Sequence, residues 1–168
     1  GFGEQDVLGF RAEQDVYQFC ILFVRDGKLL GSKSFTPLKT QADQGEIVSS
    51  VLKQYYDSSD IPDEIILPVS LPDEKVIGEW LSDRKGKKVR LTVPVRGLKK
   101  AQLDMACTNA RELLAADRKK EAKKDAAMRI LRGKLSLTKL PRRIECYDIS
   151  NISGQNAVGS MVTFQDGE

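Results

Sequence analysis

The amino-acid sequence predicts an α/β fold, with a mixed sheet, flanking helices, a long helix and a final β-hairpin. Short runs of β-branched and aromatic residues alternate with amphipathic segments, which is typical of strands separated by helices. An Asp-Gly pair after the first apolar run indicates a hairpin turn. Residues 97–133 contain no internal glycine or proline and therefore favour one long helix.

The individual elements follow from local patterns. The apolar residues Ile47, Val51 and Leu52 have helical spacing, and Thr40 is a candidate N-cap for their helix. A second helix begins at Pro72 with two acids and ends at a glycine. The predicted order is a hairpin over 15–36, a helix over 40–56, a strand over 65–69, a helix over 72–86, a strand over 87–95, a helix over 97–133 and a second hairpin from 144.

The long helix is predicted to bury one face of its first half, because apolar residues recur there at three- and four-residue steps. These residues are Leu98, Leu103, Ala106, Ala110, Leu113 and Leu114. Beyond Ala116 the helix is mostly charged. Its second half is therefore expected to face solvent or a charged ligand.

Positive charge is concentrated in one stretch of the chain. The formal net charge is only +3, yet residues 84–143 hold 20 Lys/Arg against 5 Asp/Glu, while 1–83 hold 7 against 15. Such a stretch is typical of a polyanion-binding surface. The sequence leaves two interpretations open: phosphate contact, or a solvated helix with opposite-sign pairs such as Glu121 with Lys124 and Asp125 with Arg129. The candidate DNA-binding residues are Lys87, Lys88, Arg90, Lys119, Lys120, Lys123, Lys124, Arg142 and Arg143.

Composition excludes several classes of function. The chain has no histidine, which excludes Ser-His-Asp and Cys-His catalysis within these residues and argues against a zinc site. The three cysteines, Cys20, Cys107 and Cys146, have apolar neighbours and are predicted to be buried thiols in a reducing cytosol. No apolar run is long enough for a membrane helix, and no signal peptide is recognisable. Because the chain begins with Gly1, we expect it to be an excised fragment.

Asp148 is an acid on an otherwise apolar face of a predicted strand. In a strand, Ile144, Cys146 and Asp148 share one face. A buried carboxylate is costly unless it is paired or bound to metal, and hard cations such as Mg²⁺ prefer carboxylate oxygens. One interpretation is therefore a metal ligand in a site for phosphodiester cleavage. The alternative is a solvated strand-end aspartate, or one bonded to the following loop.

A short sequence pattern occurs near both ends of the chain, and we call it the internal repeat. "FVRDGK" at 23–28 and "TFQDGE" at 163–168 are both apolar strands that run into Asp-Gly. This is either a chance recurrence of a common turn or a sign that the first module is a diverged copy of the domain starting near 144. In the second case the position of Asp148 falls near Leu8 to Phe10, where only Asp6 is close, slightly out of register.

The motif Glu-Cys-Tyr-Asp-Ile-Ser at 145–150, with the glycine-containing loop and valine-rich strand that follow, resembles the start of the catalytic domain of the UvrC family. Residues 67–114 resemble the central region of the same family, the C subunits of the bacterial UvrABC excision nuclease. The resemblance covers essentially the whole chain. It implies an RNase H-like fold for the domain that starts near 144.

The resemblance also implies a site and partners. Catalytic carboxylates and a histidine bind divalent metal, Mg²⁺ or Mn²⁺, in that family; here Asp148 would be the first carboxylate, both catalytic residue and metal ligand, with the others beyond Glu168. The implied partners are damaged DNA and the UvrB subunit, in the cytoplasm, with no membrane. On this basis we predict a non-catalytic α/β module (1–97), a basic helix and linker (98–140), and the first two strands of an RNase H-like endonuclease domain (141–168). In one interpretation the first module is a degenerate RNase H-like copy.

Two functions follow. The first is the middle of a repair endonuclease that makes the 5′ incision by metal-dependent phosphodiester hydrolysis. The fragment alone is then expected to be inactive and to hold no metal. The second is a non-catalytic scaffold that binds DNA or a partner protein.

Overall fold

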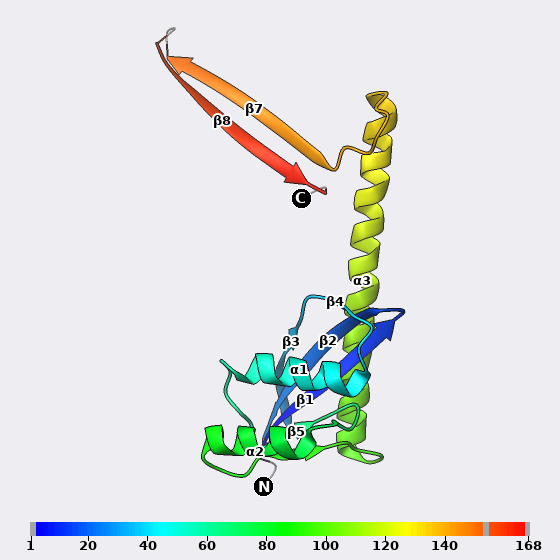
Figure 1. Ribbon diagram of the computed structural model, residues 1–168, viewed down its shortest axis with the longest axis vertical. Coiled ribbons are helices and arrows are strands. Elements are labelled where there is room, and N and C mark those ends of the chain that lie inside the picture. The colour runs from blue at the N-terminus through cyan, green and yellow to red at the C-terminus, as the bar shows by residue number, and fades with distance from the viewer. Residues whose placement is uncertain (1–2, 153–154, 167–168) are drawn as a thin grey trace. The chain divides into compact units, whose positions relative to one another are not determined.

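The first unit of the chain is built around a mixed β-sheet. The computed structural model describes residues 3–152 and 155–166 and divides into two compact units, 1–115 and 116–168. Within the first unit the strand order is β3-β2-β1-β5-β6; β1, β2 and β3 are antiparallel, whereas β1, β5 and β6 run parallel (Figure 1). The strands are β1 (Glu4–Glu13), β2 (Val16–Arg25), β3 (Lys28–Ser34), β5 (Glu64–Ile66) and β6 (Arg90–Thr92), and the short β4 (Leu38–Lys39) also pairs with β2.

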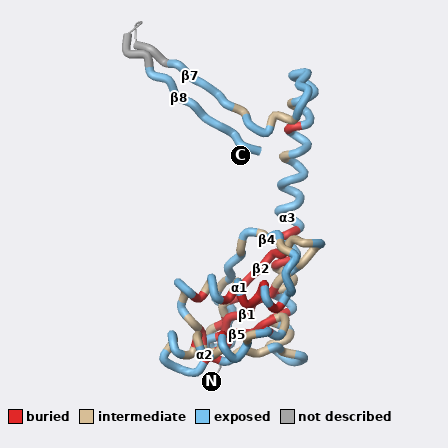
Figure 2. The backbone as a smooth tube through the Cα atoms, in the orientation of Figure 1, coloured by how far each residue is buried: buried red, intermediate tan, exposed pale blue. Residues whose placement is uncertain are grey.

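Helices cover both faces of this sheet. Helices α1 (Gln44–Tyr56) and α2 (Glu74–Lys85) cover one face, and the first half of α3 (Leu98–Lys134) covers the other (Figure 1). Successive residues of one strand point into different cores. Leu8 packs on the α1–α2 side of the sheet, and Val7 packs on the α3 side. Buried residues accordingly concentrate in and around the sheet, whereas the second half of α3 is largely exposed (Figure 2).

The α/β prediction is confirmed, with three corrections of detail. The first strand, β1, was absent from the predicted order, because its buried Gln5 and Asp6 interrupt the apolar pattern. The N-cap of α1 is Asp43, whose side chain accepts a hydrogen bond from the Gly45 N–H, and Thr40 lies outside the helix. Leu98 is 59% exposed, so it does not belong to the buried face of α3.

The second unit contains the rest of α3 and a two-stranded antiparallel hairpin, β7 (Arg143–Ile152) and β8 (Gln155–Gln165). Met128 is buried on this part of the helix. A groove of about 530 Å³ is lined by Met128 and Leu131 of α3 and by Ile144 and Phe164 of the hairpin. Much of the hairpin is exposed, including Ile149 at 74%.

The cysteine prediction holds for one residue. All three thiols are free, with Cys20 buried and Cys107 partly buried, but Cys146 is exposed on the hairpin and the prediction of burial is wrong there. Within the described ranges, no helix is long and apolar enough to cross a membrane.

Candidate active site and nucleic-acid interface

Asp148 lies on strand β7, paired with Ser160 of β8. Its neighbours Glu145 and Tyr147 point to the opposite face of the hairpin. There the Tyr147 hydroxyl donates to Glu145 Oε2 at 2.6 Å, and Arg143 Nε donates to Glu145 Oε1 at 2.7 Å. These two bonds lower the pKa of Glu145. Glu145 therefore belongs to an ion-paired surface on the face that Asp148 does not share.

A complete metal site is not formed by the part of the chain that the structure describes. Mg²⁺ takes about six oxygen ligands, and Ca²⁺ more, whereas Asp148 offers only its two carboxylate oxygens. Within the described ranges, no three His, Cys, Asp or Glu side chains gather closely enough to hold an ion. Asp148 can act as one ligand of such a site, and other ligands must come from elsewhere.

The two hairpins of the chain have the same register relative to their Asp-Gly turns. Cys20 stands six residues before Asp26 and pairs with Gly9; Ser160 stands six residues before Asp166 and pairs with Asp148. Asp26 and Asp166 also share the left-handed conformation, with φ of 48° and 52°. The two copies of the internal repeat thus belong to hairpins with the same strand pairing. The position corresponding to Asp148 is Gly9, inside the predicted range of Leu8 to Phe10.

The position of Gly9 has no room for a side chain. A Cβ atom built on Gly9 would lie 2.5 Å from the main-chain carbon of Ala106 and 2.5 Å from the main-chain nitrogen of Cys107. Both atoms belong to the backbone of helix α3, which cannot move aside as a flexible side chain would. Helix α3 therefore occupies the space that a carboxylate would need at this position of the first module.

Asp6 is the nearest acid on β1, and it has a structural role. Asp6 is only 1% exposed. Its side chain accepts a hydrogen bond from the Tyr56 hydroxyl at 2.8 Å and another from Arg25 Nη1 at 2.9 Å. Burial raises the pKa of Asp6, although both partners oppose this shift. Asp6 faces the α1–α2 side of the sheet, opposite to Gly9, because the two residues differ by an odd number of positions.

Sequence reasoning missed a buried polar network on the α3 side of the sheet. Glu64 begins β5 and is 1% exposed. It accepts hydrogen bonds from Gln5 at 2.7 Å, Thr92 at 2.6 Å and Lys99 at 2.6 Å. Burial alone would raise the pKa of Glu64, but these three donors hold it below its ordinary value. The only sequence signal was an acid directly before an apolar run.

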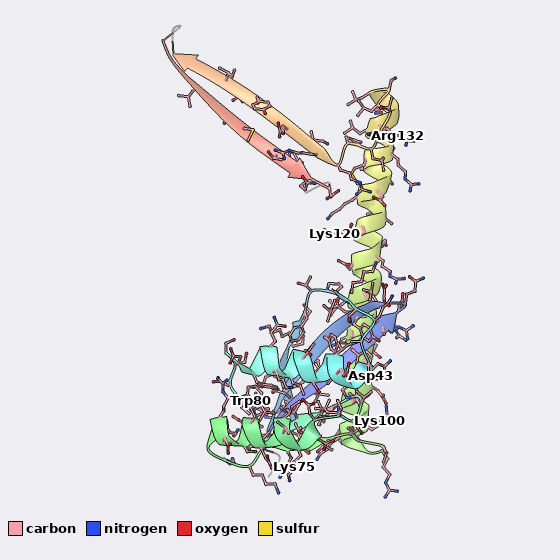
Figure 3. The ribbon with its side chains drawn as sticks, in the orientation of Figure 1. Asp43, Lys75, Trp80, Lys100, Lys120 and Arg132 are labelled. Carbon is pink, nitrogen blue, oxygen red and sulfur yellow. The ribbon has the colours of Figure 1, made fainter. Side chains whose placement is uncertain are left out.

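The predicted DNA-binding residues divide into paired and unpaired groups. Lys87 lies 2.8 Å from Asp63, Arg90 3.7 Å from Glu64, and Arg142 3.0 Å from Asp166. Arg143 pairs with Glu145, and Lys124 with Glu121 at 3.1 Å, which confirms the predicted helical pair. Within the described ranges, Lys88, Lys119 and Lys123 have no ion-pair partner. The side chain of Lys120 projects from the basic part of α3, as does that of Arg132 (Figure 3).

These features define a class of protein: a mixed α/β module in which a helix packs directly against Gly9, followed by a β-hairpin with an aspartate at the matching position. Residues 4–117 match a family described as the UvrC ribonuclease H-like domain, and residues 132–168 match the UvrC RNase H endonuclease domain. The chain belongs to the UvrC family. The RNase H-like prediction for the first module is thereby confirmed.

Curated relatives support the same conclusion. The chain is 43% identical over 167 residues to UvrABC system protein C of Syntrophus aciditrophicus, covering 99% of the chain and 27% of the relative. It is 44% identical over 168 residues to the protein of that name from Geotalea daltonii, with 99% and 27% covered, and 42% identical over 172 residues to that of a Thermoanaerobacter species, with 100% and 28% covered. The chain therefore spans little more than a quarter of the length of these relatives.

Proposed function

We propose that this chain is the central part of a nucleotide excision repair endonuclease that incises damaged DNA. A non-catalytic module at 1–97 would be joined by the basic helix and linker at 98–140 to the first two strands of the nuclease domain at 141–168. The observation that carries the proposal is the shared register of the two hairpins, which places Asp148 where the first module has the enclosed Gly9.

In the intact protein, Asp148 would be a catalytic residue because it would hold a divalent cation, Mg²⁺ or Mn²⁺, together with carboxylates from the rest of the nuclease domain. Such a cation supplies an activated water and stabilises the leaving oxygen in phosphodiester hydrolysis. The hairpin's own contribution is to hold the Asp148 carboxylate on a strand that pairs with β8. Glu145 would stay on the opposite face, held by Arg143 and Tyr147.

Partners and location follow from the family. The expected partners are damaged DNA and the UvrB subunit, in the cytoplasm. The name shared by the relatives, UvrABC system protein C, supports membership of that system.

The test of the catalytic proposal is Asp148→Asn in the full-length protein, with incision of a lesion-containing duplex measured by gel electrophoresis. We expect 5′ incision to fall by at least about a hundredfold, because a neutral amide is a poor ligand for a hard cation. Glu145→Gln is the matched control, since it removes a charge from the opposite face of the same strand. Normal 5′ incision by the Asp148→Asn protein would overturn the proposal.

A second function, non-catalytic DNA binding, is favoured by the excess of basic residues on the second half of α3, where Lys119 and Lys123 have no ion-pair partner within the described ranges. The variant with Lys119, Lys120, Lys123 and Lys124 all changed to Glu should bind duplex DNA much more weakly. Each lost phosphate contact should reduce the slope of log K against log salt by about 0.9.

The matched control for this binding test is Lys87→Glu with Arg142→Glu, because these residues are already held by Asp63 and Asp166. Their reversal should change the salt slope less than the helix variant does. Equal affinity and an equal salt slope for wild type and helix variant would remove the DNA-binding role of α3.

A further inference from the structure

A groove runs between helix α2 and the last strand of the sheet, β6. The groove has a volume of about 700 Å³. Residues of α2 form one wall, and residues 88–92 form the other. Gly78 lies on the helical wall, where a Cβ would come within 4.0 Å only of Leu91. The missing side chain leaves the middle of the groove open.

The strand wall of the groove is an unpaired sheet edge. Strand β6 ends the order β3-β2-β1-β5-β6, and within the described ranges no strand pairs with its outer side. The Arg90 N–H donates to the Asp63 carbonyl at 3.1 Å, and the Thr92 carbonyl accepts from the Leu67 N–H at 2.8 Å. Since successive residues of a strand bond to opposite sides, the N–H and C=O of Leu91 point outward into the groove.

The two walls carry opposite charge. The α2 wall presents three acids, Glu74, Glu79 and Asp83, against one base. This base, Lys75, lies 4.0 Å from Glu79, and within the described ranges Glu74 and Asp83 have no basic partner. Figure 3 shows the Lys75 side chain projecting from α2. The strand wall presents Lys88, which has no ion-pair partner within the described ranges, and Arg90, whose exposed side chain also lies 3.7 Å from Glu64. A nucleic-acid backbone would meet the acidic wall, so the charges favour a different kind of ligand.

We propose that this groove binds an extended peptide segment of a partner protein, in which basic and acidic residues alternate. The segment adds as a strand to β6 and bonds to the main chain of Leu91. Successive side chains of a strand point to opposite faces, so one set meets Glu79 and Asp83 and the other meets Lys88 and Arg90. Lysine or arginine stems on the α2 side also cover the half-buried Leu91.

The test uses the chain itself and a capped synthetic peptide in which lysine and glutamate alternate, followed by ¹⁵N NMR titration to millimolar concentration. An isomer of the same composition, with all lysines before all glutamates, is the control ligand. The alternating peptide should shift the Leu91 amide and protect it from exchange, and the block isomer should bind at least about tenfold more weakly.

Two variants locate the site. Leu91→Pro removes the outward N–H on an edge strand, where proline is tolerated, and should abolish binding. Glu79→Lys with Asp83→Lys keeps the main chain intact and should abolish binding through charge, so the test survives if the proline variant fails to fold. Glu46→Lys on α1 is the matched control and should bind normally. Absence of Leu91 shifts, equal binding of both isomers, or full binding by the charge-reversed variant would each overturn the proposal.

Discussion

The two β-hairpins of this chain pair their strands in the same register but differ in what covers them. In the first, β1 and β2 lie in the centre of a sheet with helices on both faces, and Gly9 touches the backbone of α3. In the second, β7 and β8 leave large apolar residues exposed, and Asp148 occupies the matching position. The comparison teaches that strand pairing sets where the matching position lies in each hairpin. In the first hairpin, the packing of α3 against Gly9 leaves no room for a carboxylate at that position.

The strongest way to break this comparison is to introduce an acid at the matching position of the first hairpin. Gly9→Asp should destabilise the first unit by at least about 4 kcal/mol, because the side chain would meet the α3 main chain and bury a charge without a partner. Chemical denaturation followed by circular dichroism measures the effect. Gly31→Asp in β3 is the control and should change stability by no more than about 0.5 kcal/mol, since nothing lies within 4 Å of its Cβ position.

A stable Gly9→Asp protein would contradict the packing of α3 on this position.

A second prediction concerns the buried charge on the α3 side of the first sheet. Glu64→Gln should lower stability at neutral pH by about 1–3 kcal/mol, because it removes the charge that Lys99 and Thr92 bond to. The pKa of Glu64 is lower in the folded state than its ordinary value near 4.5. Its stabilising contribution is therefore fully present above that value and is lost as the pH falls through the folded pKa.

The measurement is the free energy of unfolding of wild type and Glu64→Gln between neutral pH and strong acid. The two curves should converge in acid, where wild-type Glu64 is protonated. Glu46→Gln, in the exposed first turn of α1, is the control and should lack this convergence. A difference between Glu64→Gln and wild type that stays constant down to strong acid would contradict the role of the ionised carboxylate.

Local sequence patterns predicted most elements of the fold, but not the first strand. Helices α1, α2 and α3 each have a clear apolar period or a terminal signal. Strand β1 lacks one because its Gln5 and Asp6 are buried polar residues, whose partners Glu64 and Tyr56 stand 59 and 50 residues away. No local pattern encodes contacts at such separations, so a buried strand looks like a surface segment.

The candidate site was predictable to a similar extent. Asp148 could be singled out because it shares a strand face with the apolar residues Ile144 and Cys146, whereas identifying Gly9 required the pairing of β1 with β2. Among the basic residues, the pair of Lys124 with Glu121 was predictable from helical spacing. The pairs of Lys87 and Arg142 were not, because each acid is 24 residues away in sequence.

The smallest expected effect concerns the ion pair of the second hairpin. Arg143→Gln should leave the thermal unfolding transition unchanged, because the Arg143 side chain is 63% exposed and solvent screens its attraction to Glu145. The pKa of Glu145 should still rise, and it should rise more in Tyr147→Phe, since the Tyr147 hydroxyl contributes most to its lowered value. Carboxyl ¹³C NMR titration of both variants measures this order. A transition lowered as much by Arg143→Gln as by Glu64→Gln would mean that the two hairpins depend on their charges equally, and the contrast between buried and exposed strands would then be wrong.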